Sequence, residues 1–217
     1  LLKLKINIKS KRKFSIPRKG PLIIIANHPF GIIDGIILSS MVSEVRRDFK
    51  IITMDVLKFT KASEKFILPV DFSNSKQAIK NNINTGRKAK KYLDEGGVVI
   101  FFPAGGVAVA KKIKAPAIDA EWGNLLGSLV MKTKADVLPV YFDGKNGILF
   151  HIFASKLKSS TLKYSSYLHE TKRKIGKTID IYCGSLIKNE TLKVIDDRKQ
   201  ITLMLRDFTM SLPFQSQ

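Results

Sequence analysis

The 217-residue sequence has a single cysteine, Cys183, and no long uninterrupted apolar run. One cysteine excludes an internal disulfide framework and fits a reducing compartment, and with only three histidines it speaks against a structural zinc site. The longest apolar stretches, 22–26 and 98–110, are shorter than the roughly 20 residues that a membrane-spanning helix requires. Because the sequence begins at Leu1 and not at Met, a membrane helix upstream of it stays an open alternative.

Acidic residues are scarce, since 38 lysines and arginines face 18 aspartates and glutamates and the net charge is +20. Asp34 is the first acidic residue, so 1–20 form a basic N-terminal segment, and further basic clusters lie at 111–114 and 172–177. Such clusters attract anionic lipid head groups by about 1 kcal/mol for each cation near the surface. They would equally attract nucleic acid or an acidic protein, and a lysine-rich surface that contacts only water has the same composition.

Segments typical of strands and of helices alternate, which predicts a single α/β domain with a mixed, mostly parallel sheet flanked by helices. Strands are predicted at 2–8, 22–26, 50–53, 66–72, 98–102, 137–142, 148–153 and 178–183. Helices are predicted at 34–47, 55–60, 75–93, 119–134, 159–171 and 189–210. Pro139 favours an edge or a bulge in its strand, because proline donates no backbone hydrogen bond. The main domain is expected to cover 20–190, with 190–217 packing on it as a C-terminal helix.

The sequence ANHPFGIIDG at 26–35 places a histidine and a carboxylate at a strand-to-helix turn. The buried strand before it stops at Pro29, Gly31 lets the backbone turn, and Asp34 stands where an apolar helix begins. A neutral imidazole can take a proton from a hydroxyl, while a carboxylate on its other nitrogen fixes the tautomer and stabilises the imidazolium. His28 and Asp34 are therefore candidates for a general base and its orienting acid. The alternative is that they cap the strand and the helix.

The sequence FFPAGG at 101–106 leaves another buried strand and enters a turn of small residues. Pro103 fixes the approach of the chain, and Gly105 and Gly106 let backbone amides come close to a ligand. With Lys111 just beyond, such amides could hold a phosphate or another anion. No Gly-Lys-Ser/Thr follows, so the stretch is not a Walker A loop, and a tight turn without a ligand is the alternative.

Three stretches carry a family resemblance: NHP with Asp34, then FPAGG, then VLPVYFDGKN at 137–146. In order and in strand-loop context they resemble the lysophospholipid and glycerol-phosphate acyltransferase superfamily, also called PlsC-like. The chain looks closest to the branch of ornithine-lipid O-acyltransferases and acyltransferases labelled hemolysins, whose NHP-x-G-x-x-D motif is like residues 27–34. The resemblance covers about 20–190 and implies that this range is an acyltransferase domain with the PlsC-like fold.

The resemblance implies that His28, paired with Asp34, deprotonates a lyso-lipid hydroxyl, which attacks the thioester of acyl carrier protein or coenzyme A directly. No enzyme nucleophile, metal or redox cofactor is implied, since the acyl thioester is a co-substrate. The FPAGG turn would hold the acceptor head group or stabilise the developing oxyanion. A peripheral protein is expected, bound to the anionic surface of the inner membrane at its cytoplasmic face. The residues expected to bind substrate are Asn27, Gly31, Asp71, Phe102, Pro103, Ala104, Gly105, Gly106 and Lys111.

Three departures from the family pattern bear on the acceptor. Five residues separate the histidine from the carboxylate, where four are commoner, and Gly106 stands where the third motif usually has glutamate. The second motif usually ends in an arginine that binds glycerol phosphate, but Phe72 and Ser73 follow Asp71 here. This favours lyso-ornithine lipid or another amino-acid-containing lyso-lipid over lysophosphatidic acid. Both acceptors stay open, because a nearby lysine could replace the arginine: Lys58, Lys61 or Lys65.

Two other functions stay in view. The first is a catalytically impaired family member that binds lipid or acyl carrier protein, which Gly106 supports and the retained His28 and Asp34 oppose. The second is a nucleic-acid-binding domain, suggested by the net charge of +20. Exposed aromatic side chains would support that function, and no nucleic-acid partner is expected because most aromatic residues lie in apolar runs typical of a core. These are Phe101, Phe102, Tyr141, Phe142 and Phe150.

Overall fold

The structure is a computed structural model that describes residues 3–10, 14–54, 61–71, 73, 75–110, 115–151 and 160–215, with only the backbone described at 61, 62 and 160–165. The strands are β1 (Lys5–Lys9), β2 (Leu22–Ala26), β3 (Phe49–Met54), β4 (Ile67–Val70), β5 (Val98–Phe101), β6 (Asp136–Phe142) and β7 (Thr178–Cys183). The helices are α1 (Ile32–Ser43), α2 (Lys61–Glu64), α3 (Lys76–Asp94), α4 (Leu125–Lys132), α6 (Ser160–Lys174), α7 (Asn189–Leu192) and α8 (Arg198–Gln215). The helix predicted at 55–60 lies outside the described residues.

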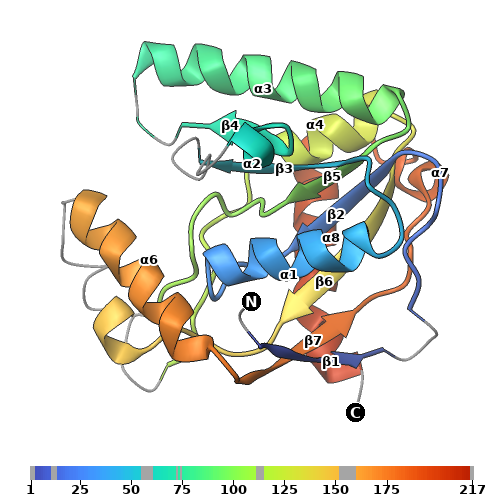
Figure 1. The fold of residues 1–217 in the computed structure, drawn as a ribbon. Coiled ribbons are helices and arrows are strands. Elements are labelled where there is room, and N and C mark those ends of the chain that lie inside the picture. The colour runs from blue at the N-terminus through green and yellow to red at the C-terminus, as the bar shows by residue number, and fades with distance from the viewer. Residues whose placement is uncertain are drawn as a thin grey trace.

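All of these strands belong to one sheet, in the order β1-β7-β6-β2-β5-β3-β4 (Figure 1). Neighbouring strands are parallel except β6 and β7, which are antiparallel. The prediction of one α/β domain with a mixed, mostly parallel sheet flanked by helices is therefore confirmed. Ligands of open α/β sheets bind beyond the carboxyl ends of the strands. The histidine motif lies at such an end, because it follows β2 in the interior of the sheet.

Both faces of the sheet are covered, and β2 supplies side chains to a hydrophobic core on each face. All five of its residues are buried, as expected of a strand in a sheet covered on both sides. Leu22, Ile24 and Ala26 pack in the core that α1 covers. Ile23 and Ile25 pack in the opposite core, with side chains from α3, α4 and α8. The end of β2 is therefore held rigidly from both sides.

The helix predicted from residue 75 is the best-defined one in the sequence, and the structure bears it out as α3. The Ser75 hydroxyl accepts a hydrogen bond of 3.0 Å from the backbone N–H of Ala78, which satisfies one of the free donors at the helix start. No helix among the described residues is both long enough and apolar enough to cross a bilayer.

The strand predicted at 148–153 is wrong where the structure describes it, because 148–151 are helical. Ile148 and Leu149 are exposed while Phe150 and His151 are buried. Two exposed residues followed by two buried ones fit one turn of a helix and not the alternation of a half-buried strand. A short apolar run alone does not distinguish the two structures.

Two predicted helices have different bounds. The segment 119–134 becomes helical only at Leu125, because the Asp119 carboxylate accepts hydrogen bonds from the His28 N–H and from the Trp122 indole and holds the chain in an irregular conformation. The segment 189–210 is two helices, α7 and α8. The Asp197 carboxylate accepts a 2.7 Å hydrogen bond from the backbone N–H of Gln200, so a new helix cap separates them.

The edge position predicted for Pro139 is wrong, because β6 lies inside the sheet between β2 and β7. The alternative of a bulge agrees better with the pairing. Pro139 lies between the bridge of Val137 with Ile187 and the ladder that begins at Val140 and Cys183, and the register changes between them. The missing proline N–H therefore falls where regular pairing with β7 is already interrupted.

Candidate active site

The turn between β2 and α1 brings His28 and Asp34 into contact. Nδ1 of His28 lies 3.0 Å from Oδ2 of Asp34. The same oxygen accepts backbone hydrogen bonds of 2.9 Å from Phe30 and 3.0 Å from Gly31. Gly31 adopts φ 77°, a left-handed conformation that glycine adopts without strain, and this lets the chain fold back onto the carboxylate. Three donors therefore fix Asp34 in the first turn of α1.

Burial and hydrogen bonding act in opposite directions on Asp34. The side chain is completely buried, and burial raises the pKa of its carboxyl group although His28 and the backbone amides lower it. Its second oxygen, Oδ1, has no hydrogen-bond partner among the described residues. With Nδ1 donating to Oδ2, Nε2 of His28 is left as a proton acceptor. The pair thus has the arrangement of a general base with an orienting carboxylate.

Phe102 fixes the plane of the imidazole. The two rings are stacked, with centroids 4.1 Å apart and an angle of 24° between the planes. The His28 side chain keeps 18% of its surface exposed, so the ring is supported on one face and still open to a substrate. Phe102, predicted to bind substrate, lies directly against the base.

Asp119 holds the backbone of the histidine, which sequence reasoning missed. Its Oδ1 accepts a 3.1 Å hydrogen bond from the His28 N–H, and its Oδ2 accepts one of 3.0 Å from the indole N–H of Trp122. The His28 carbonyl accepts another of 2.8 Å from Ala108. Burial raises the pKa of the Asp119 carboxyl group, while the hydrogen bonds from the Trp122 indole and the His28 N–H lower it. No local signal marks Asp119, because 91 residues separate it from His28.

Both polar atoms of the Asn27 side chain form hydrogen bonds inside the protein. Nδ2 donates to the carbonyl of Phe142 at 2.9 Å, and Oδ1 accepts from the N–H of the same residue at 2.7 Å. Asn27 therefore ties the end of β6 to the end of β2. A role in substrate binding would be indirect, through the position of this turn.

The FPAGG turn lies beside the histidine and is less tightly held. The N–H of Gly105 donates to the Phe102 carbonyl at 3.0 Å, and the buried Pro103 accepts from Gly123 at 3.0 Å. Ala104 is half-buried, whereas Gly106 is exposed and has no atom within 4 Å of the place that a Cβ would occupy.

The structure places Asp71 away from the histidine. Asp71 is exposed beyond the edge strand β4, where its carboxylate accepts a 2.8 Å hydrogen bond from the Ser73 N–H and its backbone bonds to Asn82. It does not line the cavity at His28. Lys111 lies outside the described residues.

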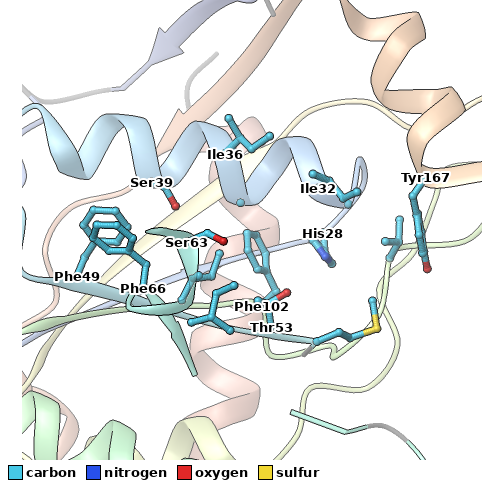
Figure 2. Close-up of a pocket in the computed structure, with 16 residues that line it drawn as sticks. His28, Ile32, Ile36, Ser39, Phe49, Thr53, Ser63, Phe66, Phe102 and Tyr167 are labelled. Carbon is cyan, nitrogen blue, oxygen red and sulfur yellow. The ribbon is translucent and has the colours of Figure 1, made fainter. Parts of the chain in front are cut away.

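An apolar cavity of about 360 Å³ opens at His28 and runs between α1 and β3 (Figure 2). Its far end is formed by Phe49 and Phe66, whose rings stack 4.9 Å apart. Gly35 keeps α1 close to β3, since a Cβ there would lie 3.1 Å from Cδ1 of Ile51. The lining residues are His28, Gly31, Ile32, Gly35, Ile36, Ser39, Phe49, Ile51, Thr53, Met54, Ser63, Phe66, Ile67, Phe102, Val107 and Tyr167. A narrow apolar space of this kind suits a hydrocarbon chain.

Cys183 is not placed to act as a nucleophile. It is the last residue of β7 and is buried, and burial raises the pKa of its thiol to about 12. Because the thiolate is the reactive form, this cysteine stays unreactive at neutral pH.

Comparison with known proteins gives a consistent result. The chain is 23% identical to a lyso-glycine lipid O-acyltransferase of Phocaeicola vulgatus, over 97% of this chain and 74% of that protein. It is 24% identical to a lyso-glycine lipid O-acyltransferase of Bacteroides thetaiotaomicron, over 70% of this chain but only 53% of that protein. The 1-acyl-sn-glycerophosphate acyltransferase PlsC of Thermotoga maritima shares the fold, with a TM-score of 0.57 and 13% identity over 96% of this chain and 72% of that one. Residues 7–143 match the family described as Acyltransferase, and the chain belongs to that family.

Proposed function

We propose that the protein is an O-acyltransferase that moves a fatty acyl group from a thioester to the hydroxyl of a lyso-lipid. The observation that carries the proposal is that the His28–Asp34 pair opens directly into the apolar cavity. A base that can activate a hydroxyl and a space that can take an acyl chain meet at one point. Membership of the acyltransferase family agrees with this chemistry.

In the proposed reaction, Nε2 of His28 takes the proton of the acceptor hydroxyl as its oxygen attacks the thioester carbonyl. The new C–O bond forms, the C–S bond breaks, and the proton passes from His28 to the departing thiolate. Asp34 stabilises the imidazolium between these two steps. A general base in this position contributes about 10²–10⁴-fold to the rate.

The acyl chain of the donor would occupy the cavity between α1 and β3, with its carbonyl near the turn at 102–106. Backbone N–H groups of this turn, with Lys111 beyond it, would stabilise the negative oxygen that develops on the attacked carbonyl. Pro103, Ala104 and Gly105 shape this turn, and the open space at Gly106 would leave room for the substrates. Acyl carrier protein or coenzyme A would carry the thioester.

An amino-acid-containing lyso-lipid is the acceptor that we favour over lysophosphatidic acid. Two relatives are named for a lyso-glycine lipid. In addition, Asp71 is followed by Phe72 and Ser73 and not by the arginine expected for glycerol phosphate.

Such a reaction requires contact with a membrane, and the surface supports a peripheral attachment. Large apolar side chains are exposed on α1, on α6 and on the short helix at 148–151: Ile36, Ile148, Leu149 and Leu168. The net charge of +20 would attract an anionic bilayer surface. These features support attachment to an anionic membrane surface with the cavity mouth toward the lipids, and we place the protein at the cytoplasmic face of the inner membrane.

The test is acyl transfer from acyl carrier protein and coenzyme A thioesters to a panel of acceptors. The panel contains lyso-glycine lipid, lyso-ornithine lipid, lysophosphatidic acid and lysophosphatidylcholine. His28→Ala is expected to lower kcat by about 10²–10⁴-fold, whereas His169→Ala, which removes an exposed histidine of α6, should leave it unchanged. Near-normal turnover by His28→Ala would disprove the base. No turnover by the unmodified protein with any pair would favour a lipid-binding or carrier-binding protein.

A further inference from the structure

The loop that follows β6 is held against α6 by buried polar contacts. The Glu170 carboxylate, 2% exposed, accepts a 2.9 Å hydrogen bond from the Gly147 N–H and pairs with Arg173 at 2.9 Å. Gly147 approaches α6 so closely that a Cβ would collide with the Arg173 guanidinium. The loop at 143–147 therefore has one fixed position beside α6.

Lys174 lies on the same face of α6 as Glu170, one helical turn further along. Its Nζ donates a 3.2 Å hydrogen bond to the Lys145 carbonyl and lies 4.1 Å from the centroid of the Phe30 ring. Within the described part of the chain it makes no ion pair. Burial lowers the pKa of the Lys174 ammonium, although Glu170 and Asp34 raise it. A half-buried cation without an ion pair is costly, and among the described residues only one of the three N–H donors of Lys174 has a hydrogen-bond partner.

Asn146 directly follows the carbonyl to which Lys174 donates, and its side chain has unused hydrogen-bonding groups. It is 3% exposed, and neither Nδ2 nor Oδ1 has a hydrogen-bond partner among the described residues. Its backbone is fixed, because Nε2 of His151 lies 3.1 Å from its carbonyl oxygen. Buried polar groups are nearly always hydrogen-bonded, so an amide whose donor and acceptor have no partner among the described residues is suited to binding a polar ligand.

This group lies near the reactive residues but outside the apolar cavity. The Lys174 ammonium lies over the Phe30 ring, and the backbone N–H of Phe30 donates a hydrogen bond to Asp34. Tyr167 lines the cavity at the His28 end, and Lys174 follows two helical turns later on α6, about 10 Å along the axis. An apolar chain and a charged group can therefore bind at separate places, about two helical turns apart along α6.

We infer that Lys174 and Asn146 bind the anionic head group of the acceptor lyso-lipid. Lys174 supplies the positive charge, and the Asn146 amide supplies directional hydrogen bonds to an amide or an anionic oxygen. A carboxylate and a phosphate share this chemistry, and the choice of acceptors separates them. The inference rests on the proposed function, because it names the head group of that reaction's acceptor.

The test compares matched acceptors with and without the charge. N-(3-hydroxyacyl)glycine carries a carboxylate, its methyl ester is neutral, and lysophosphatidic acid carries a phosphate. Lys174→Met is expected to lower kcat/KM for the charged acceptor about 10- to 100-fold, mainly through KM, as for the loss of a charge-assisted hydrogen bond. The neutral ester and the KM of the donor thioester should change less than about twofold. Lys172→Met removes an exposed charge from the same helix and is the control.

Direct binding keeps this test independent of turnover. Calorimetric titration with N-(3-hydroxyacyl)glycine and with its methyl ester should show weaker binding of the charged compound to Lys174→Met than to the unmodified protein. Asn146→Asp, which keeps the shape but adds a negative charge, should lower affinity for the charged compound and raise the relative preference for the ester. Equal losses for both compounds, no loss, or a raised KM for the donor would each overturn the inference. Charge-selective binding without turnover would support it while contradicting the proposed reaction.

Discussion

The turn after β2 and the turn after β5 meet at His28 but are built differently. In the first turn the side chains are committed to internal partners, because one oxygen of Asp34 takes three donors and both amide atoms of Asn27 bond to Phe142. In the second turn, Gly106 is exposed with empty space around it. The first turn fixes the geometry of the base, whereas the second leaves room for what the base acts on. Substitutions should therefore cost more activity and stability in the first turn than in the second.

The largest effect is expected from Asp34→Asn. The variant cannot stabilise an imidazolium, so kcat should fall by about 10²–10⁴-fold. Stability should not fall with it. Burial raises the pKa of Asp34, so its ionised form costs free energy in the folded state, and this cost increases as pH rises through the folded-state pKa. The melting temperature of Asp34→Asn minus that of the unmodified protein should therefore be higher at pH 7 than at pH 4. A variant that melts lower at both pH values would show that the carboxylate is mainly structural.

A smaller loss of activity is expected from Asp119→Ala. This change leaves the backbone N–H of His28 and the Trp122 indole without their acceptor. Each buried donor without a partner costs about 1–3 kcal/mol, so the free energy of unfolding should fall and kcat should fall about tenfold or more as the histidine loses its position. Urea denaturation and steady-state kinetics measure the two effects. Glu121→Ala, at an exposed position of the same segment, is the control. Equal behaviour of the two variants would contradict the positioning role.

The pH dependence of stability should show whether His151 stabilises the chain that follows the second turn. His151 accepts a 3.2 Å hydrogen bond from the Ala110 N–H through Nδ1, and burial lowers the pKa of its imidazole. A group with a lowered folded-state pKa binds fewer protons in the folded protein. Its contribution to stability is therefore present above the unfolded pKa of about 6.5 and is lost as pH falls below it. Between pH 7.5 and 5.5 the unmodified protein should lose more unfolding free energy than His151→Gln. Parallel curves would exclude this role.

The smallest effect is expected from Gly106→Ala, and Gly31→Ala is its contrast. At Gly106 a methyl group meets nothing within 4 Å, so stability should change by no more than about 0.5 kcal/mol. At Gly31 the φ of 77° and a contact of 3.1 Å with Cγ2 of Val107 should make the same change cost about 1 kcal/mol or more. Thermal melting compares them. Similar losses would mean that the two turns are equally constrained.

The sequence predicts the histidine site because its determinants are local. Pro29 and Gly31 define the turn within a few residues of His28 and Asp34, and strand β2 is marked by its continuous apolar run. The same reasoning predicted the α/β class, since it depends only on the alternation of strands and helices. Short-range chemistry of this kind does not depend on the order of strands in the sheet.

The parts that sequence reasoning missed depend on that order. The apolar cavity forms only when β3 lies beside β5 and α1 packs above it, and Asp119 reaches His28 across 91 residues. A signal for the cavity did exist, since Gly31, Gly35 and Ser39 recur every four residues and leave one side of α1 without large side chains. The strand predicted at 148–153, which is wrong at the described residues 148–151, has the same origin, because an apolar run shows burial but not the partner that it packs against.

The pairing of β1 with β7 has a consequence for synthesis on the ribosome. Lys9 and Tyr182, which are in contact in the finished sheet, are 173 residues apart in the chain. At about 5–20 residues per second, β1 is synthesised on the order of ten seconds or more before β7, its neighbour in the described sheet. During this time Ile6 and Ile8 stand on a strand with free backbone groups. Lys5, Asn7 and Lys9 alternate with them, and the two lysines keep the unpaired strand from pairing with other nascent chains.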